Sequence, residues 1–185
     1  AGRTVSHNLG VAPEMIWVKK RSAAASWIVL PPVANSGQKY MSLNADISLQ
    51  DYADYWNDTQ PTSAVFTIDT DNDVNQSSAT YISYLFATLA GVSKLGTVTH
   101  SGSSTDVDCG FSNGARFVLL KRTDATGDWY VWDSARGIIA GNDPYLLLNT
   151  TAAAVTNTDF IDPLNAGFTI SDAFTDGDYI FYAIA

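Results

Sequence analysis

The feature that most constrains the fold is an internal repeat, because one half of the sequence aligns with the other in the same order. Six pairs of blocks align: residues 4–7 with 97–100, 15–20 with 117–122, 27–29 with 129–131, 40–44 with 145–149, 65–68 with 167–170, and 81–87 with 179–185. Self-similarity of this kind indicates a structural unit that is present twice. We therefore predict two β repeats, residues 1–95 and 96–185, packed together as one compact unit.

The matched blocks are predicted to be strands. Residues 15–18 and 117–120 are short continuous apolar runs, which are typical of strands covered on both faces. Residues 124–128 contain Asp and Gly and have the composition of a hairpin turn. Roughly ten to twelve short strands with turn signals between them predict an all-β fold. We expect a β-sandwich, jelly-roll or lectin-like, built from the two repeated halves; two small domains remain the alternative.

The composition disfavours helices. Glu14 is the only glutamate, and Thr, Ser, Val, Tyr and Asn stand in place of the usual helix formers. Residues 47–56 and 151–161 are the two segments that could be helical, but both contain polar side chains that compete for backbone hydrogen bonds. We expect loops there, with at most one helical turn.

Charge, hydropathy and cysteine content exclude several classes of protein. The formal net charge is -9 and the basic side chains form no run beyond residues 19–21, so we expect no nucleic-acid partner. No apolar stretch approaches the roughly 18 residues that span a bilayer, so we expect no membrane insertion. Cys109 is the only cysteine, which excludes an intrachain disulfide and a thiolate metal site built by one chain.

The sequence carries no pattern of catalytic residues. His7 and His100 are the only histidines, and they occupy matched blocks, which indicates a repeated strand-end feature rather than one assembled site. A catalytic triad needs a nucleophile, a base and an orienting group that converge, and glycoside cleavage needs two carboxylates flanking one bond. Neither pattern is signalled, so we predict that the protein is not an enzyme and needs no cofactor.

A run of aspartates at residues 69–75 is the one segment that resembles a calcium loop. Asp69, Asp71 and Asp73 alternate as calcium ligands do in such loops. The match to the EF-hand pattern fails twice, because Val74 stands where the glycine is needed and Thr80 where the bidentate glutamate belongs. The favoured interpretation is a solvated β-turn, and a weakly bound Ca²⁺ at the three aspartates is the alternative.

An aromatic and polar cluster in one loop is the candidate ligand-binding site. It consists of Tyr52, Tyr55, Trp56, Asn57 and Asp58. Glycan binding needs exposed aromatic rings beside amides and carboxylates, and this cluster contains all three. The favoured interpretation of the tryptophan is nevertheless structural, because Trp is mostly buried on average and can fold back over the edge of the sandwich.

Five segments also carry a likeness to a known family: SHNLGVAPEMIWVKKR, YWNDTQPTSAVFTI, ATYISYLFA, FVLLKRTDATGDWYVWDSARG and YLLLNTTAA. They resemble a repeated β-domain of predicted tail-fibre and other structural proteins of bacteriophages, particularly marine ones. The resemblance covers nearly the whole chain. It implies a place in the virion, assembled in the host cytoplasm, beside other virion proteins and in a homo-oligomer for which a trimer is favoured.

Two functions follow from the resemblance together with the residues. The first is a tail-fibre or adhesin domain that contacts a host-surface glycan or protein. The alternative is an architectural subunit without a ligand, which decorates a capsid or forms a filament.

Overall fold

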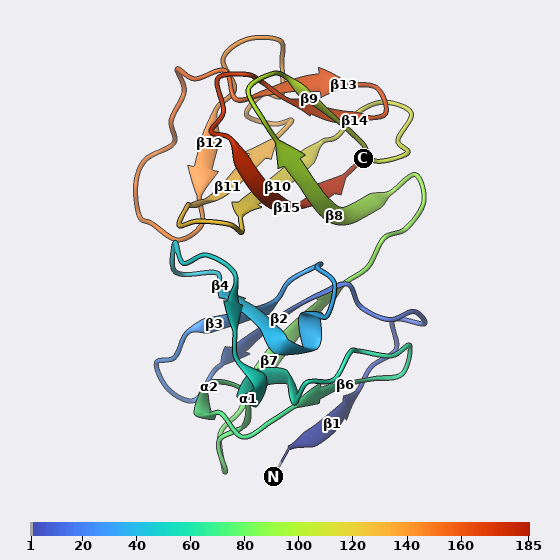
Figure 1. The fold of residues 1–185 in the computed structure, drawn as a ribbon, viewed down its shortest axis with the longest axis vertical. Coiled ribbons are helices and arrows are strands. Elements are labelled where there is room, and N and C mark those ends of the chain that lie inside the picture. Colours follow the sequence, from blue (N-terminus) through green and yellow to red (C-terminus); the bar gives the residue numbers. More distant parts are fainter. Residues whose placement is uncertain (1) are drawn as a thin grey trace. The chain divides into compact units, whose positions relative to one another are not determined.

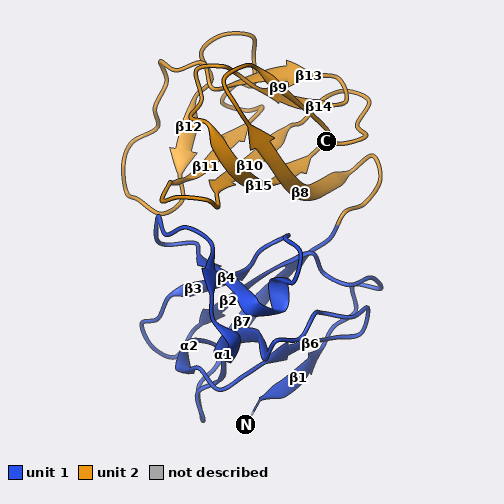
Figure 2. Cartoon of the chain, in the orientation of Figure 1, with its two compact units in different colours: residues 1–87 blue, residues 88–185 orange. Residues whose placement is uncertain are grey.

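The structure is a computed structural model that describes residues 2–185 (Figure 1). The chain divides into two compact units, residues 1–87 (unit 1) and 88–185 (unit 2), each with a hydrophobic core of its own (Figure 2). The boundary lies earlier than the predicted one after residue 95, because Ser93–His100 pairs with a strand of unit 2. The packing of the halves into one body stays a prediction.

Unit 1 is a small sandwich of two antiparallel sheets. Its larger sheet has the strand order β5-β4-β3-β2-β7, and its smaller sheet consists of β1 and β6. The elements of unit 1 are β1 (Arg3–Ser6), β2 (Met15–Lys20), β3 (Trp27–Leu30), η1 (Ser36–Gln38), β4 (Lys39–Ser42), β5 (Gln50–Asp51), α1 (Ala53–Trp56), β6 (Val65–Ile68), α2 (Asn72–Asn75) and β7 (Tyr81–Phe86).

Unit 2 has the same two-layer plan with more strands. Its larger sheet has the order β12-β11-β10-β15-β8, and its smaller sheet has the order β13-β14-β9. The elements are β8 (Ser93–His100), β9 (Thr105–Asp108), β10 (Phe117–Arg122), β11 (Trp129–Asp133), β12 (Tyr145–Leu147), β13 (Ile161–Leu164), β14 (Gly167–Ile170) and β15 (Gly177–Ile184). The predicted all-β class is confirmed.

The two cores explain why the apolar runs of the sequence become interior strands. In unit 1, Ile16 and Val18 of β2 are buried against Phe66 and Ile68 of the smaller sheet. Because β2 lies between β3 and β7, and β10 between β11 and β15, both runs have neighbours on either side. Each core is therefore closed between its two sheets, as expected for a sandwich.

The two larger sheets share their register around two equivalent tryptophans. Trp27 pairs with Lys19 in unit 1, and Trp129 pairs with Lys121 in unit 2. The lysine Nζ lies 5.9 Å from the ring centroid in unit 1 and 5.8 Å in unit 2. The main-chain N–H of each tryptophan donates to an Asn Oδ1, at 2.7 Å to Asn44 and at 2.9 Å to Asn149. Descent of the two units from a duplicated ancestor stays a prediction.

One matched pair of blocks does not occupy equivalent strands. Residues 4–7 lie at β1, which pairs with β6, whereas residues 97–100 lie in β8, which pairs with β15. The register equates β1 with β9 instead, because Arg3 pairs with Ile68 as Thr105 pairs with Ile170. A short alternating strand suits either sheet, so local similarity could not identify its partner. For the same reason, His7 and His100 are not equivalent.

The helical content is as low as the composition predicts. α1 is a single turn at the end of residues 47–56, and residues 151–160 form no helix, since Val155 makes an isolated bridge with Tyr145. The predicted β-turn in the aspartate run is wrong, because Asn72–Asn75 forms a helical turn, α2. Among residues 2–185, no helix is long and apolar enough to cross a membrane.

Candidate binding site

A cluster of three tyrosines surrounds the beginning of α1. The rings of Tyr52 and Tyr55 lie 4.7 Å apart between centroids, and Tyr40 of β4 lies 4.8 Å from Tyr55, both edge to face. The Tyr52 N–H donates to the Gln38 carbonyl at 2.9 Å, which holds the start of α1 beside β4. We call Tyr40, Tyr52 and Tyr55 the tyrosine cluster.

Exposure differs sharply among the predicted ligand-binding residues. Tyr52 is 39% exposed, Tyr55 is 9% exposed, and Trp56 is completely buried in the core of unit 1. The Trp56 Nε1 has no hydrogen-bond partner, so the ring serves packing alone. The structural interpretation of Trp56 is therefore confirmed, and Tyr52 is the one ring of the predicted loop that a ligand could contact.

A shallow open hollow brings Tyr52 together with polar side chains from three segments. Its lining consists of Gln38, Lys39, Asp51, Tyr52, Ala53 and Asp58. Lys39 and Asp51 form an ion pair with 2.6 Å between Nζ and Oδ1. No local sequence pattern marks Gln38, Lys39 or Asp51, since only the pairing of β4 with β5 brings them beside Tyr52.

The turn after α1 separates the remaining two predicted residues. Asn57 and Asp58 both adopt left-handed backbone conformations, with φ of 55° and 49°. Asn and Asp tolerate this region better than other side chains, which explains their presence here. Asp58 lines the hollow beside Tyr52, whereas Asn57 lines a separate one with Arg3 and Thr67.

Burial and nearby carboxylates keep the hydroxyl groups of Tyr52 and Tyr55 protonated. Burial raises the pKa of Tyr55 above its ordinary value of 10.0, and the nearby charge of Asp71 raises it further. The pKa of Tyr52 is also raised, by desolvation and then by its hydrogen bond to Asp71. The Tyr52 hydroxyl donates to Asp71 Oδ2 at 3.2 Å, and it presents an intact phenol to the hollow.

The three aspartates of the predicted cation site have other partners. Asp71 is the N-cap of α2, and its Oδ1 accepts the Asp73 N–H at 2.7 Å. The main chain of Asp69 is held by Tyr55 and Asn75. Within the described part of the chain, no three His, Cys, Asp or Glu side chains are grouped to hold a metal ion. The helical turn thus replaces the calcium-loop geometry, and a weakly bound Ca²⁺ stays a prediction.

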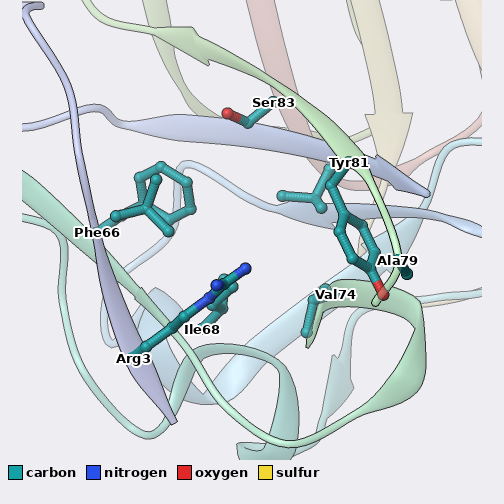
Figure 3. A pocket seen from close by; sticks show the side chains of 9 residues that line it. Arg3, Phe66, Ile68, Val74, Ala79, Tyr81 and Ser83 are labelled. Atoms are coloured by element: carbon teal, nitrogen blue, oxygen red, sulfur yellow. The ribbon is translucent and has the colours of Figure 1, made fainter. Parts of the chain in front are cut away.

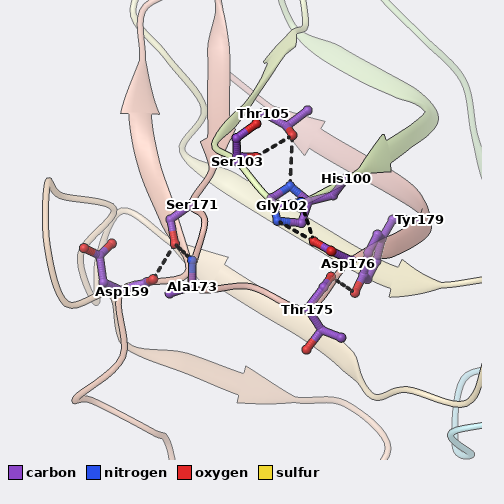
Figure 4. Close-up of polar contacts among 10 residues, drawn as sticks. All are labelled: His100, Gly102, Ser103, Thr105, Asp159, Ser171, Ala173, Thr175, Asp176 and Tyr179. Atoms are coloured by element: carbon purple, nitrogen blue, oxygen red, sulfur yellow. Dashed lines mark hydrogen bonds and ion pairs between the residues drawn. The ribbon is translucent and has the colours of Figure 1, made fainter.

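His100 is the buried member of a polar network at one end of unit 2 (Figure 4). Its Nδ1 lies 2.9 Å from Thr105 Oγ1, and its Nε2 lies 4.0 Å from Asp176 Oδ1. Asp176 also accepts the Gly102 N–H at 2.6 Å, so the network closes the turn after β8. Because His100 is only 1% exposed, a substrate has no access to it.

The comparisons with known proteins give one match. A family model described as "Domain of unknown function (DUF7483)" matches residues 1–185. No curated protein and no solved structure matches the chain.

Proposed function

The chain belongs to the DUF7483 family, and we propose, from its resemblance to phage structural proteins, that it is a non-catalytic binding module of a bacteriophage virion. In this proposal it forms a tail-fibre or adhesin domain that contacts a host-surface glycan. The observation that carries the proposal is the exposed Tyr52 ring in the open hollow.

The chemistry of the hollow suits a carbohydrate better than an apolar ligand. One face of a sugar ring packs on an aromatic ring, and its hydroxyl groups need donors and acceptors at the rim. Lys39 and Gln38 offer donors, while Asp51 and Asp58 offer carboxylate oxygens. Tyr52 is held by Tyr55 and by Asp71, so little side-chain entropy is lost when a ligand stacks on it.

Single hollows of this kind bind weakly, so the proposal includes assembly. A homo-oligomer, with a trimer favoured by the phage resemblance, would present several hollows to one host surface and raise the avidity. Other virion proteins are the proposed neighbours in the particle.

We predict that Tyr52→Ala lowers the affinity for a bacterial surface polysaccharide by about tenfold, the loss typical of an aromatic anchor. The intact chain is first screened against lipopolysaccharide O-chains and capsular polysaccharides, and the strongest binder is then titrated by calorimetry. Tyr84→Ala is the matched control, because Tyr84 is 43% exposed but does not line the hollow.

Two outcomes would count against the adhesin proposal. Equal losses for the Tyr52 and Tyr84 variants would place the binding elsewhere. An absence of polysaccharide binding, combined with self-association in light scattering, would favour the architectural subunit instead.

A further inference from the structure

In the larger sheet of unit 2, β8 covers the outer edge of β15. β8 pairs antiparallel with the whole of β15, from His100 opposite Gly177 to Ser93 opposite Ile184. Val98 of β8 packs against the core, and His100 is buried at its end. β8 therefore seals the side of the sandwich between its two sheets.

The same edge is open in unit 1. β7 is the equivalent of β15, since Tyr81 pairs with Lys20 as Tyr179 pairs with Arg122. β7 is the last strand of its sheet, and within residues 2–185 no strand pairs with its outer side. Tyr81 is only half-buried, whereas Tyr179 is 2% exposed under the cover of β8. Unpaired strand edges are sites where another strand can add.

A cavity of about 210 Å³ lies in unit 1 beside this edge (Figure 3). It is lined by Arg3, Val5, Val18, Phe66, Ile68, Val74, Ala79, Tyr81 and Ser83. A cavity of about 150 Å³ is known to hold benzene, so this one has room for a phenyl ring.

One difference between the units accounts for the room. Ser83 pairs with Val18 as Phe181 pairs with Leu120, so Ser83 stands where unit 2 has a phenylalanine. The Phe181 ring packs against Phe168 at 5.8 Å between centroids. Opposite it, β8 carries Gly96, where an added Cβ would lie 3.0 Å from the Phe181 ring. In unit 2 the Phe181 ring of β15 fills this position. In unit 1 the position is part of the cavity, which has room for an aromatic ring from a strand added to β7.

The charge of Arg3 favours a particular residue type at a second position of any strand that adds to β7. Arg3 is the register equivalent of Thr105, which contacts His100 of β8. The Arg3 side chain points into the cavity (Figure 3), and no described residue forms an ion pair or hydrogen bond with its guanidinium. The residue of an added strand at the place of His100 would therefore face a positive charge, which an Asp or Glu complements.

We propose that β7 of unit 1 is an acceptor edge for an extended strand of a partner polypeptide. The strand adds antiparallel to β7 in the register that β8 has on β15. Its pattern is a large aromatic residue opposite Ser83, a β-branched residue opposite Tyr81 and an acidic residue near Arg3, each two positions apart. The main chain supplies hydrogen bonds, and the alternate side chains supply specificity.

The test uses two synthetic peptides and the full-length chain. The first peptide has the sequence of residues 93–100; the second carries Gly96→Phe and His100→Asp in that sequence. We expect the second peptide to bind the native chain at least about tenfold more tightly in fluorescence anisotropy, since burying a phenyl side chain favours binding by that order. Arg3→Ala should reduce its affinity several-fold, and added salt should do so as well.

Ser83→Phe is the decisive variant, because it recreates the Phe181 arrangement of unit 2. It should invert the preference, so that the peptide with glycine binds more tightly than the peptide with phenylalanine. Equal binding of the two peptides, or an unchanged preference in the variant, would overturn the proposal. Amide chemical-shift changes on the native chain give an independent readout. They should be centred on β1 and β7, and changes elsewhere would also overturn it, as would light scattering that shows a second copy already on this edge.

Discussion

Replacement of Phe168 by alanine is expected to lower the free energy of unfolding of unit 2 by about 3–5 kcal/mol, the usual range for a buried phenylalanine. Phe168 is completely buried, and its ring contacts Phe181 edge to face at 5.8 Å. The neighbouring core residues come from both sheets, so the space left behind cannot collapse without moving strands. Urea unfolding, followed by amide exchange in β14, measures the loss.

Phe66→Ala is the matched variant in unit 1. Its loss in free energy of unfolding should be smaller than that of Phe168→Ala by about 1–2 kcal/mol. Phe66 is 3% exposed, but it already lines the cavity beside β7, so one side of its ring lacks packing partners. Amide exchange in β6 separates this effect from unit 2. Equal losses for the two variants would mean that the cavity does not loosen the packing around Phe66.

The strands that the sequence identified are those whose signal is local. Apolar runs at β2 and β10 indicate burial on both faces whatever their partners are, and the Trp27 and Trp129 strands follow them at short range. The partner of β8 could not be identified in this way, because it is set by β15, which follows β8 by about 80 residues in sequence. The open edge of β7 was therefore invisible in the sequence.

The candidate site shows the same division. The loop that carries Tyr52 and Asp58 was identified from composition, and Tyr52 does lie in a hollow. The polar side chains around it come from β4 and β5, and their approach depends on a two-residue strand pairing. Trp56 belongs to the same stretch of sequence but points into the core, since a one-turn helix directs neighbouring side chains to different sides.

The aspartate run forms a helical turn, and not the predicted β-turn, for a physical reason that is visible only in the structure. Asp71 accepts a backbone N–H at the start of α2, which is the ordinary role of an aspartate at a helix N-cap. A side chain used in this way is no longer directed to a common centre with Asp69 and Asp73. The alternation of Asp residues predicts a β-turn or a calcium loop; the structure has the helical turn capped by Asp71, and a weakly bound Ca²⁺ stays a prediction.

Replacement of Asp143 by asparagine is expected to stabilise unit 2 at pH 7. Asp143 is completely buried; its Oδ1 accepts the Ile139 N–H at 2.8 Å, and its Oδ2 has no hydrogen-bond partner. Burial raises the pKa of this carboxyl from 3.8 to about 6, and the charges of Asp159 and Asp162 add to the rise, while backbone amides oppose it. The ionised form is therefore the costly one in the folded state.

The sign of the pH dependence follows from that shift. The folded pKa lies above the unfolded one, so between about pH 4 and pH 6 the folded protein holds a proton that the unfolded chain has lost. The contribution of the protonated Asp143 carboxyl to the free energy of unfolding is complete below about pH 4, and it is lost as the pH rises through about 6. At about 1.4 kcal/mol per pKa unit, the loss is about 3 kcal/mol.

Asparagine keeps the acceptor for Ile139 but has no ionised form, so Asp143→Asn should gain up to about 3 kcal/mol at pH 7 and almost nothing at pH 4. The main chain of residue 143 donates to the Thr158 carbonyl, and the Thr158 Oγ1 and Asp159 Oδ1 atoms in that segment are buried without a hydrogen-bond partner. Urea unfolding at several pH values with EDTA present measures the difference, and Asp172→Asn, at an exposed aspartate, is the control that should leave the profile unchanged. A variant less stable than the native chain at pH 7 would show that the ionised Asp143 is held by a favourable partner, and that its burial is not the dominant cost.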